Sequence, residues 1–287
     1  MMIQILLILI VVALACSLLG SLLLMRSSLM VADAISHTIL LGIVIAFYFT
    51  EDLSSPYLII GATLFGVITV ILIDLLTKTG RMQNDAAIGL VFPLLFSIAV
   101  IIISKYYTNV HLDIDMVLLG QVELAPLRQV EIFSFQLPQA FFVGLIILFI
   151  NLAFIFVFYN PLKVRLFDET FARTIGINVA ALDLVLMTLV SLTAVTSFES
   201  VGSILVIALM AAPGMTARCF TNKFNTLLIG SAFIAILNSV LGYYIGIYLD
   251  TSISSMVAVT GFVVFLLVFL GTNIILPKLR QQKLALK

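Results

Sequence analysis

The chain of 287 residues is 63% hydrophobic and only 10% charged, whereas a soluble domain is about half apolar. This composition excludes a soluble globular enzyme, a disordered chain and a nucleic-acid-binding protein. The long apolar runs also disfavour an outer-membrane barrel, whose strands alternate apolar and polar residues. Lys+Arg and Asp+Glu balance at 14 each, so net charge indicates no polyanionic partner. The two cysteines, Cys16 and Cys219, are expected to be free thiols.

The apolar runs predict an all-α, polytopic bundle of transmembrane helices that occupies residues 1–287 as a single domain. One span takes about 20 residues, so the apolar content allows about nine spans. The expected spans are residues 3–25, 31–49, 57–76, 86–104, 137–159, 182–197, 201–217, 227–249 and 253–276. The sixth and seventh spans are short. Glu199 between them belongs either to a loop or to a re-entrant break, so eight spans are an alternative.

The basic residues predict how these spans are oriented. All but two of the 14 Lys and Arg residues fall on one side of the nine-span arrangement, the exceptions being Lys105 and Arg128. That side is expected to be cytoplasmic, because cytoplasmic loops are enriched in basic residues. The N-terminus is therefore expected outside the cell membrane and the C-terminus in the cytoplasm.

The outer stretch 106–136 is longer than a turn. Its apolar residues are spaced for a short helix at the membrane surface, and they are Met116, Leu119, Val122 and Leu124. The same stretch contains His111, Asp113 and Asp115, which either bind metal at the outer mouth or belong to a solvated acidic loop.

The inner stretch 160–183 predicts one or two short cytoplasmic helices. Pro161 is expected to break span five, Asp168 and Glu169 lie in a favourable first turn, and Gly176 is a plausible C-cap. An apolar stripe at spacing i, i+4, i+8 is expected there, formed by Phe167, Phe171 and Ile175.

The sequence lacks the common motifs of catalysis. It contains no G-x-x-x-x-G-K-[ST] phosphate loop, no H-E-x-x-H zinc pattern and no G-x-S-x-G elbow. The chain is therefore expected not to be an enzyme, and any nucleotide hydrolysis that drives it must occur in another protein.

The most informative polar residues are Asp33 and His37, which lie inside an apolar run. At spacing i, i+4 they share one helix face about 6 Å apart along the axis. Ionisable residues within a membrane are costly and usually line a cavity or pair with one another. A carboxylate with an imidazole suits Mn, Fe or Zn better than Ca or Mg, and two such ligands make half a site. The alternative is a hydrogen-bonded pair that only stabilises the bundle. Ser36 between them is expected to pack or support the ligands.

Three other residues within the spans have structural interpretations. Asn151 and Asn238 are expected to form hydrogen bonds between helices. Pro93 is expected to kink the fourth span.

Several segments together resemble one family. Residues 33–37 (D-A-I-S-H), with Gly42 five residues on, are similar to the G-D-A-I-S-H signature of ABC-3 family permeases, the membrane subunits of manganese, zinc and iron ABC importers. Further similar segments follow in order along nearly the whole chain. They are residues 85–89 (D-A-A-I-G), 118–120 (L-L-G), 167–169 (F-D-E) with Ala172 and Gly176, and 200–205 (S-V-G-S-I-L) followed by Pro213.

The resemblance implies the following function. The chain would be the permease subunit of an importer for Mn²⁺, Zn²⁺ or Fe²⁺, with Asp33 and His37 as metal ligands and no permanently bound cofactor. Its partners would be a second permease subunit, identical or related, a cytoplasmic ABC ATPase dimer and an extracytoplasmic metal-binding protein. The residues expected to couple it to the ATPase are Phe167, Asp168, Glu169, Phe171, Ala172 and Gly176.

Two other transporter classes are alternatives. A proton-coupled secondary metal transporter often shows inverted repeats and charged relays within its spans. No convincing inverted repeat is found here. A permease for cobalamin or siderophores would have a longer chain and a wider cavity without ligands such as Asp33 and His37.

Overall fold

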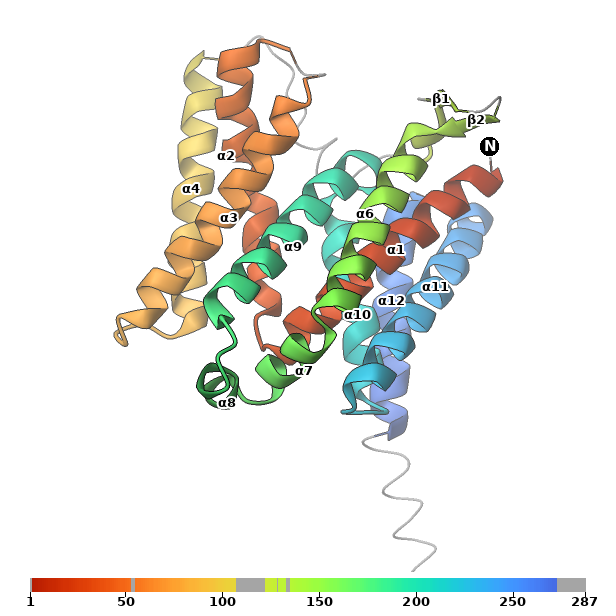
Figure 1. Cartoon of the computed structure of the whole chain (residues 1–287). Helices are drawn as coiled ribbons and strands as arrows, with labels where there is room; N and C mark the ends of the chain where they lie inside the picture. The colour runs from red at the N-terminus through yellow and green to blue at the C-terminus, as the bar shows by residue number, and fades with distance from the viewer. Residues whose placement is uncertain (1, 53–54, 107–121, 128, 133–134, 273–287) are drawn as a thin grey trace, which may run out of the picture.

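The structure, a computed structural model, describes residues 2–52, 55–106, 122–127, 129–132 and 135–272 and is almost entirely helical (Figure 1). Its helices are α1 (Met2–Met25), α2 (Leu29–Thr50), α3 (Tyr57–Lys78), α4 (Asn84–Tyr106), α6 (Gln139–Val157), α7 (Tyr159–Phe167), α8 (Glu169–Thr174), α9 (Val179–Val201), α10 (Ser203–Arg218), α11 (Phe224–Leu249) and α12 (Ile253–Leu270). A 3₁₀ turn, η1 (Ala125–Leu127), precedes the antiparallel hairpin of β1 (Gln129–Ile132) and β2 (Phe135–Pro138).

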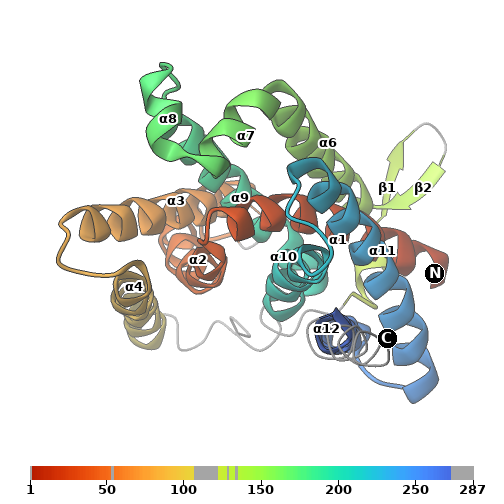
Figure 2. The same cartoon turned by 90° about the horizontal axis from the view of Figure 1, so that it is seen from below.

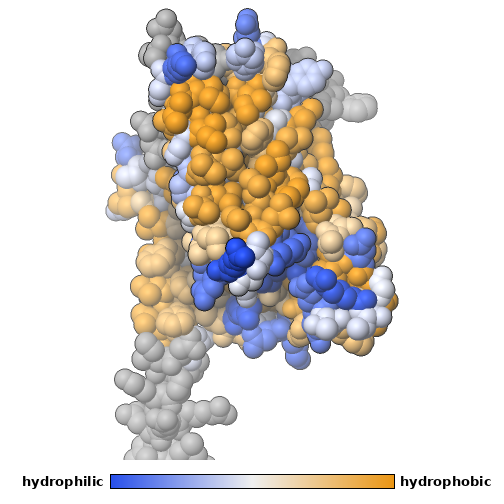
Figure 3. All heavy atoms as spheres, turned by 90° about the vertical axis from the view of Figure 1, so that its left-hand side faces the viewer, coloured by the Kyte–Doolittle hydropathy of each residue, from blue (hydrophilic) through white to orange (hydrophobic). Residues whose placement is uncertain are grey.

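The predicted polytopic helix bundle is confirmed. Eight helices of the described chain are long and apolar enough to cross a membrane. The expected seventh span corresponds to α10, whose 16 residues extend only about 24 Å against a hydrocarbon core of about 30 Å. One face of the molecule shows a broad apolar band bordered by polar residues at both ends, as a membrane-spanning surface requires (Figure 3).

Helix α1 lies at the centre of the bundle (Figure 2). It packs against α6, α9, α10 and α11, and most of its side chains are buried. Helices α2, α3 and α4 pack together on one side of it, and α10, α11 and α12 pack together on the other. The turns after α1, α3 and α10 lie at the same end of the bundle as α7 and α8, which we call the α8 end, while the hairpin and the start of α1 lie at the opposite end (Figure 1).

The break near Glu199 lies elsewhere than the sequence suggested. Helix α9 continues through Glu199 to Val201, and the chain turns at Gly202, with φ 83° and ψ 158°. Only glycine adopts this region of the Ramachandran map without strain, which gives a physical reason for glycine in the S-V-G segment. Hydropathy located a break here but placed Glu199 in it, because a carboxylate interrupts an apolar run without interrupting a helix.

The prediction that Pro161 breaks span five was wrong, and the kink expected at Pro93 stays a prediction. Pro161 does not break the helix; it lies in the first turn of α7, where proline is tolerated, and the break falls at Phe158 between α6 and α7. Pro93 lies inside α4, which continues on both sides of it.

Buried polar groups follow the predictions in part. Asn151 joins three helices as expected: its Nδ2 donates to Thr193 Oγ1 of α9 at 3.0 Å and to the carbonyl of Ala15 in α1 at 3.4 Å. The expected bond of Asn238 is not found, because both polar atoms of its amide are buried without a partner among the described residues. Cys16 and Cys219 are free, as predicted.

Some predictions lie outside the described residues. The segment 107–121 includes His111, Asp113 and Asp115, part of the expected surface helix, and the L-L-G segment. The segment 273–287 includes the end of the last expected span and the basic C-terminal residues.

Candidate metal site and surface helix α8

Asp33 and His37 lie on one face of α2, as their spacing predicted. They are about 6 and 12 Å along the helix from Leu29, so the pair is nearer the α8 end than the hairpin end. Asp33 Oδ1 lies 3.7 Å from His37 Nε2, and the two side chains are 38% and 34% exposed. Both groups are therefore reachable from outside the chain, although the helix that carries them is otherwise apolar.

Helix α4 orients the imidazole of His37. The ring stacks on Phe92, with centroids 5.5 Å apart, and meets the edge of Phe96 at 5.8 Å. Two aromatic neighbours leave the nitrogen side of the ring directed along α2 towards Asp33. Sequence reasoning missed both phenylalanines. Their i, i+4 spacing in the fourth span is the signal that indicates a shared face.

Helix α3 fixes the position of α2 behind the site. A Cβ added to Gly42 would lie 2.3 Å from the carbonyl oxygen of Gly61, so only glycine permits this approach of the two helices. Nearer the site, Thr69 Oγ1 of α3 donates to Thr38 Oγ1 of α2 at 2.7 Å. Gly42, the last residue of the signature segment, therefore acts by packing, whereas Asp33 and His37 present functional groups.

The separation of the pair suits a shared metal better than a hydrogen bond. At 3.7 Å the two atoms are too far apart to hydrogen-bond. A metal bonded to both at about 2.1 Å would allow separations up to about 4.2 Å. Ser36, as expected, is not directed at the pair: its hydroxyl donates to the carbonyl of Ala32 at 2.9 Å. Within the described ranges, no cluster of three or more His, Cys, Asp or Glu side chains is placed to hold an ion, so the described part of the chain offers two ligands here.

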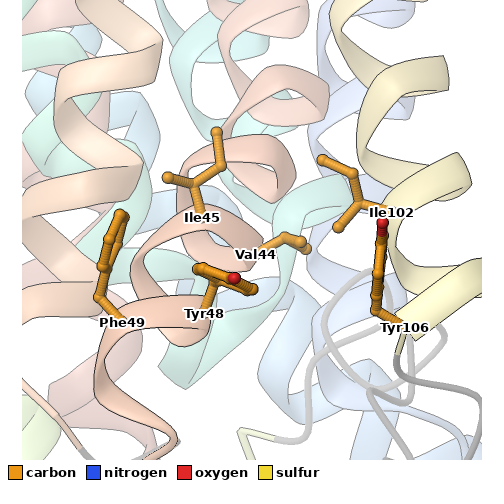
Figure 4. Close-up of a pocket in the computed structure, with 6 residues that line it drawn as sticks. All are labelled: Val44, Ile45, Tyr48, Phe49, Ile102 and Tyr106. Atoms are coloured by element: carbon orange, nitrogen blue, oxygen red, sulfur yellow. The ribbon is translucent and has the colours of Figure 1, made fainter.

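A separate groove lies between α2 and α4, towards the hairpin end (Figure 4). It measures about 340 Å³ and is lined by Val44, Ile45, Tyr48, Phe49, Ile102 and Tyr106. Val44 is two helical turns beyond His37 on the same face of α2. The lining is apolar apart from two tyrosine hydroxyls, so the groove itself supplies no metal ligands.

Helix α8 is a short helix with a defined cap at each end. The Asp168 carboxylate accepts a hydrogen bond from the backbone N–H of Phe171 at 2.9 Å, as an N-cap residue does. At the other end Gly176 has φ 84°, and the N–H of Ile177 donates to the carbonyl of Ala172 at 3.0 Å. This is the Schellman arrangement, and it confirms the predicted C-cap. A helix of six residues is too short to be stable alone, and the two caps stabilise it.

The predicted apolar stripe is present only in part. Phe167 is the last residue of α7, and the extended backbone of Asp168 separates it from α8, so the three residues do not share one continuous helix. Spacing alone could not reveal that interruption. All three side chains are nevertheless exposed, Phe167 at 65%, Phe171 at 54% and Ile175 at 52%. Ala172 is fully buried beneath them.

The charged residues of α8 interact with one another. Arg173 donates to Glu169 Oε1 at 2.7 Å, and Arg165 of α7 lies 3.2 Å from Glu169 Oε2. The hydrogen bond from Arg173, aided by the charge of Arg165, lowers the pKa of the Glu169 carboxyl below its usual value. Glu169 therefore remains ionised at neutral pH and ties α8 to the end of α7.

The chain belongs to the ABC 3 transport family, whose family model matches residues 1–272. Over 254 residues it is 43% identical to the manganese transport system membrane protein MntD of Bacillus subtilis, covering 88% of this chain and 86% of that protein. It is 39% identical over 270 residues to the zinc transport system membrane protein TroD of Treponema pallidum, covering 94% of this chain and 74% of that protein.

The fold also matches that of a solved structure. The structure of PsaBC from Streptococcus pneumoniae in complex with a Fab matches with a TM-score of 0.75 and 26% sequence identity, covering 93% of this chain and 90% of that one. The chain is thus a multi-pass membrane protein of the ABC-importer permease class, as the resemblance implied. This class assignment favours an ATP-driven transporter over the proton-coupled alternative.

Proposed function

We propose that the chain is the permease subunit of an ATP-driven importer that moves Mn²⁺, Zn²⁺ or Fe²⁺ across the cytoplasmic membrane. The observation that carries the proposal is the Asp33–His37 pair, two metal-binding side chains 3.7 Å apart and partly exposed on an apolar helix. Ionisable groups are costly in a membrane, and those that occur there usually mark a substrate or ion pathway. Relatives named for manganese and zinc transport support the metal class, and this donor pair accepts all three ions.

A second permease chain is proposed to complete the metal site. One chain contributes two ligands, whereas a transition metal takes four or more. A two-fold axis beside α2 would bring an equivalent pair from a second copy, and a related chain with the same pair would serve equally. The partial exposure of both side chains supports an open face at this point. The ion is cargo, so no cofactor is expected to stay bound.

ATP hydrolysis by a partner protein is proposed to be coupled to transport through α8. The sequence has no phosphate loop, so ATP would be hydrolysed by a separate ABC ATPase dimer. Phe167, Phe171 and Ile175 are exposed outside the apolar helices, where an apolar surface is best explained by a protein partner. Asp168, Glu169, Ala172 and Gly176 would shape this surface by capping and packing. The α8 end would then be cytoplasmic, and a metal-binding protein would deliver the ion at the hairpin end.

Transport by the assembled complex in liposomes tests the proposal. Mn²⁺, Zn²⁺ and Fe²⁺ are offered in turn with the cognate ATPase and binding protein, with ATP or with a proton gradient alone. ATP-dependent uptake of at least one ion, and no uptake driven by the gradient alone, is expected. Uptake driven by the gradient without ATP would refute the proposal and restore the proton-coupled alternative.

A further inference from the structure

A cluster of buried charges connects α8 with the turn that begins α2. Arg165 of α7 donates to both carboxylate oxygens of Asp183 in α9, with Nε to Oδ1 at 3.1 Å and Nη2 to Oδ2 at 2.8 Å. Arg26, which follows α1, reaches the same Oδ2 at 3.3 Å. Arg165 also contacts Glu169 of α8 at 3.2 Å. The order Glu169–Arg165–Asp183–Arg26 therefore runs without a gap from α8 to the end of α1.

The turn at Arg26 is too short for α1 and α2 to move independently of one another. Only residues 26–28 separate α1 from α2. Ser27 has φ 59°, a left-handed conformation that strains a residue other than glycine. The N–H of Ser28 donates to the carbonyl of Leu23 at 3.0 Å, which closes the C-terminus of α1. A displacement of Arg26 must therefore reach α2, whose second turn carries Asp33.

The cluster is buried more deeply than a surface ion pair. The side chains of Arg165, Asp183 and Arg26 are only 10%, 15% and 12% exposed. Replacement of a buried ion pair by apolar residues is often neutral or stabilising, so stability alone is a weak reason for charges here. In addition, Nη1 of Arg26 is buried without a hydrogen-bond partner among the described residues. An unsatisfied buried donor is unfavourable in this arrangement of the helices. Another arrangement in which Arg26 gains a partner would remove that cost, so Arg26 is suited to change partners when the helices move.

We propose that Arg165, Asp183 and Arg26 are positioning residues that transmit movement of α8 to the metal ligands of α2. The inference rests on the proposed function, because α8 must be where the ATPase binds and α2 must carry the metal site. Binding of ATP to the ATPase would then change the metal affinity of the Asp33–His37 pair through this cluster. By thermodynamic linkage, metal at the site would change the affinity of the complex for ATP by the same factor.

The variant Arg26→Gln in the reconstituted complex tests the link, since Arg26 lies at the far end of the cluster from α8. Three quantities are measured: ATPase affinity, metal ions moved per ATP hydrolysed, and metal affinity with and without a non-hydrolysable ATP analogue. Affinity for the ATPase is expected to stay within about twofold of the wild type. Metal moved per ATP is expected to fall, because nucleotide would no longer change the affinity of the metal site, a change of about tenfold for a typical coupling between sites. The shift in metal affinity caused by nucleotide should disappear, while affinity without nucleotide stays unchanged.

Arg81→Gln is the matched control. Arg81 is exposed in the turn between α3 and α4, at the same end of the molecule. The same change of charge there should leave all three quantities unchanged. If Arg26→Gln does not assemble, Asp183→Asn keeps side-chain volume and removes the carboxylate charge that Arg26 and Arg165 share, so it tests the same link.

Two results would overturn the inference. One is an unchanged nucleotide-dependent shift in the metal affinity of Arg26→Gln. The other is loss of ATPase binding by this variant, which would mean that the cluster only holds the docking surface together. Failure of the proposed function is distinguished from failure of this inference by the wild-type complex, which would then show no ATP-dependent metal uptake.

Discussion

Replacing Phe171 by alanine tests whether α8 binds the ATPase. A phenylalanine side chain buries about 200 Å² when fully covered. Because Phe171 is 54% exposed, docking would cover about 110 Å² more, worth about 2.7 kcal/mol at 25 cal/mol per Å². Phe171→Ala should therefore weaken the permease–ATPase complex about 100-fold. Titration of the detergent-solubilised permease with labelled ATPase measures this dissociation constant.

Phe220→Ala is the control for an exposed phenylalanine at the same end. Phe220 lies in the turn between α10 and α11 and is 66% exposed, but it is outside α8. Its replacement should change the dissociation constant by less than threefold, and both variants should keep the wild-type unfolding temperature. Equal ATPase affinity of Phe171→Ala and the wild type would refute the docking surface and direct the search to the basic C-terminal tail.

Three further predictions follow from the backbone and the topology. Gly202→Ala should destabilise the solubilised protein by about 1–3 kcal/mol, because alanine is strained at φ 83°; thermal unfolding measures this, and Gly89→Ala, where an added Cβ meets nothing within 4 Å, should show no loss. Asp168→Ala removes the N-cap of α8 and should cost that helix about 1 kcal/mol, seen as faster hydrogen exchange of its amides. With native thiols replaced, single cysteines at Phe167 and Glu51 should react with an impermeant reagent from opposite sides of the membrane, because α3, α4 and α6 lie between them; reaction of both from one side would contradict the proposed orientation.

Much of the bundle could be predicted because membrane helices are encoded by long apolar runs. The third span was expected at residues 57–76 and is found as α3, Tyr57–Lys78. The Asp33–His37 face followed from helical period alone, because both residues lie within one uninterrupted helix. Gly176 could be predicted as a C-cap because this cap depends on local backbone chemistry. Asp168 was expected in the first turn beside Glu169, and the structure places it one position earlier, as the N-cap.

The rest depends on contacts between distant segments. Phe92 approaches His37 because α4 packs on α2, and no local pattern reports that pairing. The Arg26–Asp183 contact likewise joins the ends of two helices that are far apart in the sequence. Local backbone conformation was a second source of error. The interruption at Asp168 divides the apolar stripe. The turn at Gly202 leaves Glu199 in a helix, which the sequence did not reveal because hydropathy alone cannot distinguish a polar helical residue from a loop.

Asp33 and His37 are proposed to bind the transported ion. The most direct measurement counts the transition metal ions bound per pair of permease chains in the purified complex, for the wild type, Asp33→Asn and His37→Gln. Both substitutions keep side-chain size and remove one ligand. We expect one ion per pair of chains in the wild type and at least a hundredfold weaker binding in each variant, with assembly and ATPase affinity unchanged. Wild-type metal binding by both variants would contradict this proposal.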